Sequence, residues 1–127
     1  MTSSRRILVV TPTPSVARSV IHCLSAARYR AIVRADFLAA RSEIDEHAPD
    51  LLVTEVRLGA FNGLHLAIRA RGRGAHTQTI VIGAPDSVLE AEASRQEICY
   101  LTLPLDEDMF VVTTRRILQQ AESLSSA

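Results

Sequence analysis

Short, unbroken apolar runs alternate along the chain with longer stretches in which apolar residues recur every three or four positions. A short unbroken run is typical of a strand covered on both faces, and the longer period is typical of an amphipathic helix. The apolar runs predict strands at residues 7–10, 30–34, 51–54, 79–82 and 99–101. The periodic stretches predict five helices, one after each strand.

Residues that stop or cap an element mark the predicted boundaries. Pro12 and Pro14 end the first strand because proline supplies no amide to a sheet. Asp36 is placed to cap a helix over residues 37–47. The carboxylates of residues 106–108 lie where the positive end of the last helix is expected.

The helical period also predicts which helical side chains are buried. The third helix carries Leu64, Ala67 and Ile68, and Gly72 and Gly74 are expected to end it. The other predicted buried side chains are Val16, Val20, Leu24 and Ala27 in the first helix, Leu38 and Ile44 in the second, and Phe110, Ile117, Ala121 and Leu124 in the last.

Five strands that alternate with five helices predict one doubly wound α/β domain, a five-stranded parallel sheet with flavodoxin-like strand order 2-1-3-4-5. We assign this domain to residues 5–124 and regard residues 1–4 and 125–127 as tails. In this order, a site is expected at the rim formed by the carboxyl ends of strands one, three, four and five. The predicted rim residues are Thr11, Pro12, Thr13, Glu55, Gly83, Ala84, Leu103 and Pro104.

The charged residues narrow the function classes. All 14 basic residues are arginine and they balance 14 acidic residues, so amine chemistry and a strongly basic surface are both excluded. Arg69, Arg71 and Arg73 form a locally basic stretch, which we interpret as capping at a helix end. No nucleic-acid partner is therefore expected.

Other classes are excluded by missing patterns. No apolar run is long enough for a membrane span or a signal peptide, so we expect no membrane contact and a cytoplasmic location. Cys23 and Cys99 are interpreted as small buried apolar residues. The four histidines are scattered and no nucleophile elbow is present, so we expect no enzyme, metal or cofactor.

Two stretches carry a family resemblance: residues 49–58, continuing through Asn62-Gly63-Leu64, and residues 100–105. They resemble the third strand with its loop, and the fifth strand with its following turn, of the receiver domain of two-component response regulators. The resemblance covers almost the whole chain, from Arg5 to about Leu124. It implies a phosphorylation site made of an acidic pair, an acceptor aspartate, a Thr or Ser, and a lysine.

This sequence departs from that set at every position. Thr11 and Pro12 stand at the acidic pair, Glu55 at the acceptor, Gly83 at the Thr or Ser, and Leu103 at the lysine. Mg²⁺ needs several oxygen ligands, and a carboxylate displaced by about 1 Å can cost on the order of a hundredfold in rate. We therefore predict a degenerate receiver that is not phosphorylated at Glu55.

The sequence leaves the roles of Glu55, Tyr100 and Pro104 open. Glu55 either imitates an aspartyl phosphate or is a partly exposed residue that pairs with Arg57, bonds to the Thr11 hydroxyl or meets solvent. Tyr100, at the position of the family's aromatic switch residue, is either a switch or a half-buried aromatic with a wet hydroxyl. The bond before Pro104 is a candidate cis peptide, which the resemblance implies.

Two functions from different classes follow. The first is a signalling module that binds other proteins, such as a kinase or an output domain, or that forms a homodimer. The family's dimer face would here carry Glu90, Glu92, Arg95, Asp106, Asp108, Arg115 and Arg116. The alternative is a flavodoxin-like binder of a small molecule or phosphate, whose ligand would contact the hydroxyls of the loop Thr11–Ser15, although Pro12 and Pro14 remove two amide donors there.

Overall fold

A parallel sheet of five strands forms the centre of the molecule in the computed structural model, which describes residues 5–73 and 76–125, with side chains described through residue 121. The strand order is β2-β1-β3-β6-β7, so the flavodoxin-like order predicted from the sequence is confirmed. The strands are β1 (Ile7–Val10), β2 (Ala31–Arg34), β3 (Leu51–Glu55), β6 (Gln78–Gly83) and β7 (Cys99–Thr102).

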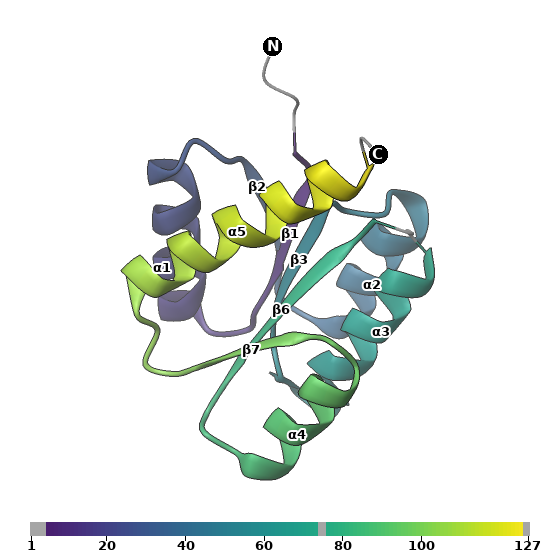
Figure 1. The fold of residues 1–127 in the computed structure, drawn as a ribbon. Coiled ribbons are helices and arrows are strands. Elements are labelled where there is room, and N and C mark those ends of the chain that lie inside the picture. The colour runs from purple at the N-terminus through teal and green to yellow at the C-terminus, as the bar shows by residue number, and fades with distance from the viewer. Residues whose placement is uncertain (1–4, 74–75, 126–127) are drawn as a thin grey trace.

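Helices cover both faces of this sheet, and Figure 1 shows α1 and α5 on one side and α2, α3 and α4 on the other. The helices are α1 (Pro14–Ala26), α2 (Phe37–Glu46), α3 (Gly63–Arg73), α4 (Ser87–Arg95) and α5 (Glu107–Ser125). Within the described ranges, no helix is both long and apolar enough to cross a membrane.

Two apolar cores result, because successive residues of a strand point to opposite faces. Leu8 and Val10 of β1 join the core beneath α2, α3 and α4. Ile7 and Val9 join the core beneath α1 and α5, where Phe110 is fully buried. This two-sided burial explains the unbroken apolar runs of the central strands.

Side-chain caps fix where three of the helices begin. Asp36 accepts a hydrogen bond from the Ala39 amide at 2.8 Å, as expected for the cap of α2. The side chain of Asp86 accepts from two amides of α4, and Glu90 Oε2 accepts from the Asp86 amide at 3.0 Å, a reciprocal pair one residue longer than a capping box. Asp106 caps α5 in the same way, through the Met109 amide.

Some burial predictions are wrong. Leu38 is 52% exposed, whereas Ile44 is buried as expected, because the buried face of α2 runs through Ala40 and Ile44. The edge strand β2 is covered less than predicted, and its Ile32 and Val33 side chains are exposed. Val16 and Ile117 are only half-buried, Ala27 lies after the end of α1, and Leu124 lies outside the described side chains.

The segment after β3 also differs from the predicted loop. It forms a small antiparallel hairpin, β4 (Arg57–Leu58) and β5 (Phe61–Asn62), and the ring of Phe61 stacks on Phe37. The hairpin returns the chain so that the Gly63 amide donates to the Val56 carbonyl at 2.7 Å. Gly72 lies inside α3 and does not end it, and Gly74 is outside the described residues.

The outer edge of β2 is covered by one of its own side chains. The Arg34 guanidinium donates to the Val33 carbonyl at 2.9 Å and pairs with Glu43 at 2.9 Å. The Val33 carbonyl faces away from β1, because the neighbouring Arg34 carbonyl accepts from the Thr11 amide on the β1 side. Arg34 therefore satisfies a backbone acceptor that edge strands usually leave open.

Candidate functional site

A cleft of about 370 Å³ lies at the rim where the loops after β1, β3, β6 and β7 meet. This position at the carboxyl ends of the strands is where sites form in open α/β sheets. The structure thus brings together most of the rim residues predicted from the sequence. The cleft is lined by Pro12, Thr13, Glu55, Val56, Arg57, Ile82, Gly83, Ala84 and Leu103.

Glu55 is the only carboxylate in this lining, and it is buried, with 8% of its surface exposed. It ends β3, and its Oε2 accepts a hydrogen bond from the Thr13 hydroxyl at 3.2 Å. Burial raises the pKa of Glu55 above its usual value, and the hydroxyls of Thr13 and Thr11 partly counteract this shift. The charged carboxylate is therefore disfavoured at this position.

Of the features expected for Glu55, the partial exposure and the pair with Arg57 are wrong, whereas the expected hydrogen bond with the Thr11 hydroxyl is one of the two that lower its pKa. Among the described ion pairs none joins Glu55 to Arg57, and Arg57 is exposed on β4. The hydroxyl partner that sequence reasoning missed is Thr13, which had been considered only as part of a phosphate-binding loop. The signal for it was present, since Thr13 follows strand β1 next to β3 in the predicted order.

Tyr100 points inward over Gly83, and its hydroxyl donates to the Ala84 carbonyl at 2.7 Å. The hydroxyl makes this bond at an exposed position and the ring is half-buried, in line with the half-buried aromatic expected from the sequence. A Cβ placed on Gly83 would lie 2.5 Å from the Tyr100 hydroxyl and 2.6 Å from Val56 Cγ1. Glycine at this position is thus what leaves room for the tyrosine.

The turn after β7 closes the cleft on its other side. The Leu103 amide donates to the Gly83 carbonyl at 2.8 Å, which ties this turn to the end of β6. The Leu103–Pro104 peptide bond is cis, the isomer that the resemblance suggested. The half-buried Leu103 side chain joins the core beneath α1 and α5 and also lines the cleft. An apolar side chain consequently stands where the resemblance implies a cation.

The loop Thr11–Ser15 uses its hydroxyls internally. The Thr11 hydroxyl accepts from the Thr13 amide at 3.0 Å, and Thr13 donates to Glu55. The start of α1 has Pro14 as its first residue and no side-chain cap. A phosphate bound at this loop would meet the Glu55 carboxylate and few free donors, so the geometry disfavours an anion here.

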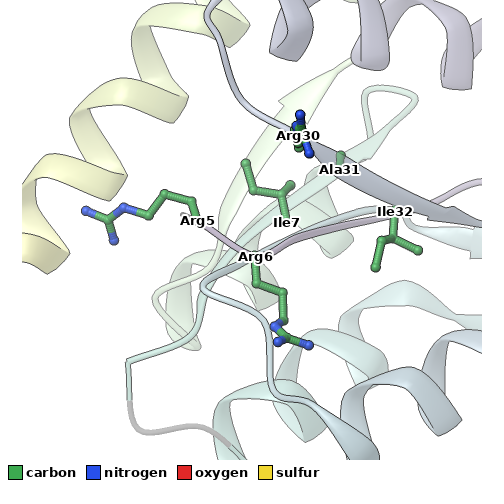
Figure 2. A pocket seen from close by; sticks show the side chains of 6 residues that line it. All are labelled: Arg5, Arg6, Ile7, Arg30, Ala31 and Ile32. Atoms are coloured by element: carbon green, nitrogen blue, oxygen red, sulfur yellow. The ribbon is translucent and has the colours of Figure 1, made fainter. Parts of the chain in front are cut away.

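A second hollow, of about 440 Å³, lies at the opposite end of β1 and β2. Figure 2 shows Arg5 extended toward a neighbouring helix and Arg6 extended in a different direction, away from Arg5 and Arg30. Arg5 donates to the Leu118 carbonyl of α5 at 3.4 Å. Because the guanidinium groups diverge, they do not form a convergent site for an anion.

The locally basic stretch is engaged in bonds within the protein. Arg69 and Arg73 both pair with Asp45, at 2.8 and 3.2 Å, and the pKa of that carboxyl is lowered mainly by its hydrogen bond from Arg69. Arg71 donates to the Gln96 carbonyl, which caps the end of α4. These bonds hold the three side chains in place, but only one carboxylate faces the guanidinium groups, so the stretch keeps a net positive charge.

The predicted dimer face is partly committed to the protein's own structure. Glu90 and Asp106 cap helices, and Arg95 pairs with Glu92. Arg115 and Arg116 are exposed on α5, and no ion pair is found for either within the described side chains.

Metal ligands and cysteines add no second site. In residues 5–73 and 76–125 no three His, Cys, Asp or Glu side chains lie close enough together to hold a metal ion. Cys23 is buried and Cys99 half-buried, both as free thiols, and burial raises the pKa of each.

Comparison with curated proteins finds relatives among response regulators. The chain is 29% identical over 126 residues to the response regulator MprA of Mycobacterium tuberculosis, which covers 98% of this chain and 55% of MprA. It is 26% identical over 121 residues to the transcriptional regulatory protein TrcR of the same organism, covering 94% of this chain and 47% of TrcR. The chain thus spans about half the length of these relatives. No protein-family model matches it.

Solved structures with the same fold are receiver domains. The signal receiver domain of an HD domain-containing protein from Pseudomonas fluorescens matches with a TM-score of 0.89 and 24% identity, over 99% of this chain and 96% of that one. A CheY-like response regulator receiver domain protein from Methanospirillum hungatei matches with a TM-score of 0.85 and 18% identity, over 95% and 98%. The chain therefore has the receiver-domain fold.

The buried carboxyl of Glu55 predicts a specific dependence of stability on pH. Because the folded-state pKa is raised, the stability from this group is fully present below its ordinary value of 4.5 and is lost as pH rises through the raised pKa. Glu55→Gln keeps an acceptor for Thr13 without the charge. We expect its gain in free energy of unfolding over the wild type, measured by urea denaturation, to grow as pH rises from 4.5 through the raised pKa and to level off above it.

The control for this measurement is Glu46→Gln, which removes an exposed carboxylate at the end of α2. Because an exposed carboxylate carries little desolvation penalty, this variant should show no comparable gain in free energy of unfolding. A Glu55→Gln variant that is less stable than the wild type above the raised pKa would contradict burial of an uncompensated charge.

The packing around Gly83 predicts that even one methyl group is destabilising. Gly83→Ala should lower the free energy of unfolding by about 1–3 kcal/mol, since it overpacks against Tyr100 and Val56. The loss should shrink in a Val56→Ala, Tyr100→Phe background, which a double-mutant comparison measures. Gly72→Ala, with open space around the glycine in α3, should be neutral or stabilising. Equal losses in free energy of unfolding for Gly83→Ala and Gly72→Ala would contradict the close packing around Gly83.

Proposed function

We propose that this chain is a receiver-like module of two-component signalling that works by contacting other proteins and does not accept a phosphoryl group. The receiver-domain fold and the response-regulator relatives support the signalling role. The proposal that the chain does not accept a phosphoryl group rests on one observation. Glu55 is buried in a cleft that Pro12, Gly83 and Leu103 also line.

Phosphoryl transfer to Glu55 is opposed by its surroundings. An attacking carboxylate must be ionised and in line with the phosphorus, while cations neutralise the phosphoryl oxygens. Burial raises the pKa of Glu55, and the Thr13 hydroxyl already occupies its Oε2. The cleft contains one carboxylate for a metal ion, and Leu103 gives no charge to the phosphoryl group.

The module is held in one conformation by packing at the rim. Tyr100 lies inward because Gly83 leaves space for its hydroxyl, and the bond to Ala84 retains it there. Glu55 makes no described bond to Tyr100, so the inward position does not depend on the charge of Glu55. This supports the view that Glu55 is not an imitation of a phosphorylated aspartate.

The surface available to a partner is the one formed by α4, β7 and α5, and we propose that a second copy of the chain binds there. Val112 and Met109 are exposed large apolar residues of α5, and Val112 is 62% exposed. Arg116 follows Val112 by four residues, so the two share one face of the helix. Arg116 also lines a hollow with Cys99 of β7, which supports assigning this face of α5 to the β7 edge.

A kinase or the output domain of a response regulator would be the heterologous alternative on the same surface. TrcR and MprA are both longer than this chain. A contact between this surface and the output domain of a longer regulator would therefore also fit a protein-binding module.

Phosphorylation is tested by the intact mass of the protein with Mg²⁺ and a small acyl-phosphate donor. We expect no added phosphoryl group on the wild type or on Glu55→Asp, because restoring the shorter acceptor leaves the metal ligands and the cation missing. A phosphorylatable receiver domain treated in parallel serves as the positive control. A stable adduct on the wild-type chain would refute the proposal.

Dimerisation is tested by sedimentation velocity over a wide range of protein concentration. We expect a reversible dimer that Val112→Glu converts to a monomer, since a carboxylate is placed in an apolar contact. Leu38→Glu is the matched control, because Leu38 is 52% exposed, against 62% for Val112, and lies on α2 across the sheet. A wild-type monomer at every concentration would contradict the second-copy proposal.

A further inference from the structure

The rim cleft combines one buried carboxylate with mostly apolar walls. Its volume of about 370 Å³ lies within the range of small-molecule pockets, which are usually apolar with a few polar anchors. The apolar residues of the lining are the exposed Pro12, the half-buried Leu103, and Val56 and Ile82, which are 5% and 1% exposed.

The electrostatics of the cleft favour a cation. The groups that lower the pKa of Glu55 are two neutral hydroxyls, so the charged form has no cationic side chain to compensate it. Arg57 also lines the cleft, where it is exposed and makes no described ion pair with Glu55. A buried carboxylate of this kind gains most from a ligand that brings its own positive charge.

An inorganic metal ion fits this lining less well than an organic cation. Mg²⁺ and Ca²⁺ require several oxygen ligands, and Glu55 is the single carboxylate in the cleft. An ammonium group needs only one carboxylate and a hydroxyl, while its carbon substituent can cover Leu103 and Val56.

We propose that the rim cleft binds a small organic amine, with its ammonium group on the Glu55 carboxylate and its apolar substituent against Leu103 and Val56. The inference rests on the proposed function in one respect, namely that Glu55 remains an unmodified carboxylate. The loop Thr11–Ser15 suggested an anionic ligand such as phosphate, whereas the ligand proposed here is a cation. Thr13 donates to Glu55 and is not free for a phosphate.

A ligand in the cleft can act on Tyr100 through Ala84. Ala84 lines the cleft, and its carbonyl accepts the hydrogen bond of the Tyr100 hydroxyl. Leu103 is tied by its amide to the carbonyl of Gly83 on the same segment. An amine in the cleft therefore contacts the segment that holds the aromatic ring on the α4–β7–α5 surface.

The test is titration of the full chain with benzylamine, followed by amide chemical shifts of the rim residues. We expect saturable shifts at Thr13, Glu55 and Gly83, and no comparable binding of benzyl alcohol or benzoate, which match the ring but lack the positive charge. Affinity should fall as pH is lowered through the raised pKa of Glu55, because the protonated carboxyl no longer attracts the ammonium.

Two variants locate the interaction. Glu55→Gln removes the charge, and Leu103→Lys supplies an ammonium from the protein itself, so each should weaken benzylamine binding at least about tenfold. Glu46→Gln, at the far end of α2, should bind as the wild type does. Unchanged affinity in either rim variant, absence of saturable shifts, or tighter binding of benzoate would each overturn the proposal.

The titration contains no phosphate donor, so its outcome is separate from the phosphorylation test. Loss of amine binding with no phosphoryl adduct would end this inference and leave the signalling proposal intact. A phosphoryl adduct on Glu55 would end both, because the carboxylate would then be consumed.

Discussion

The end of strand β3 sets the central constraint on this molecule, because the strand carries a carboxylate into the lining of the rim cleft with only 8% of the residue's surface exposed. Residues 51–55 are buried without a break, since helices cover both faces of the sheet at this strand. Glu55 therefore leaves bulk water whether or not a partner is present. The nearest compensation is the Thr13 hydroxyl, which is a weaker partner than a cation. The composition and low charge of the cleft around it follow from this position.

Hydrogen bonds and packing take over the role that charges have in the family the sequence resembles. Tyr100 is positioned by the Ala84 carbonyl and by the space at Gly83, and the loops after β6 and β7 are joined by backbone atoms of Gly83 and Leu103. These contacts need neither a metal ion nor a phosphoryl group. The rim can consequently keep a defined shape while the residues expected for catalysis of phosphoryl transfer are replaced.

Strand order and helix starts could be predicted because they depend on local and periodic signals. Buried central strands read as apolar runs, and Asp36 caps its helix as its position indicates. Leu38 was mispredicted because periodicity alone did not choose between two adjacent faces of a short helix, and the packing of Ala40 and Ile44 decided it. The hairpin after β3 was missed because two-residue strands have no period to detect.

The candidate site was predictable in location but not in its contacts. The carboxyl ends of the strands placed Glu55, Gly83 and Leu103 at one rim, and the structure brings them into one cleft. The inward Tyr100 and the bond from Thr13 depend on side-chain rotamers and on distances of a few tenths of an ångström. A one-dimensional pattern contains no such information, so these contacts required the folded arrangement.

The arginine folded over the edge of β2 bears on how copies of this protein can associate. With the Val33 carbonyl already satisfied by Arg34, β2 is a poor template for an added strand. The opposite edge, β7, is unpaired on its outer side in the described sheet. Growth by edge-to-edge pairing uses both edges of every sheet, and at one of the two an outward carbonyl is already bonded. This arrangement works against growth into a filament.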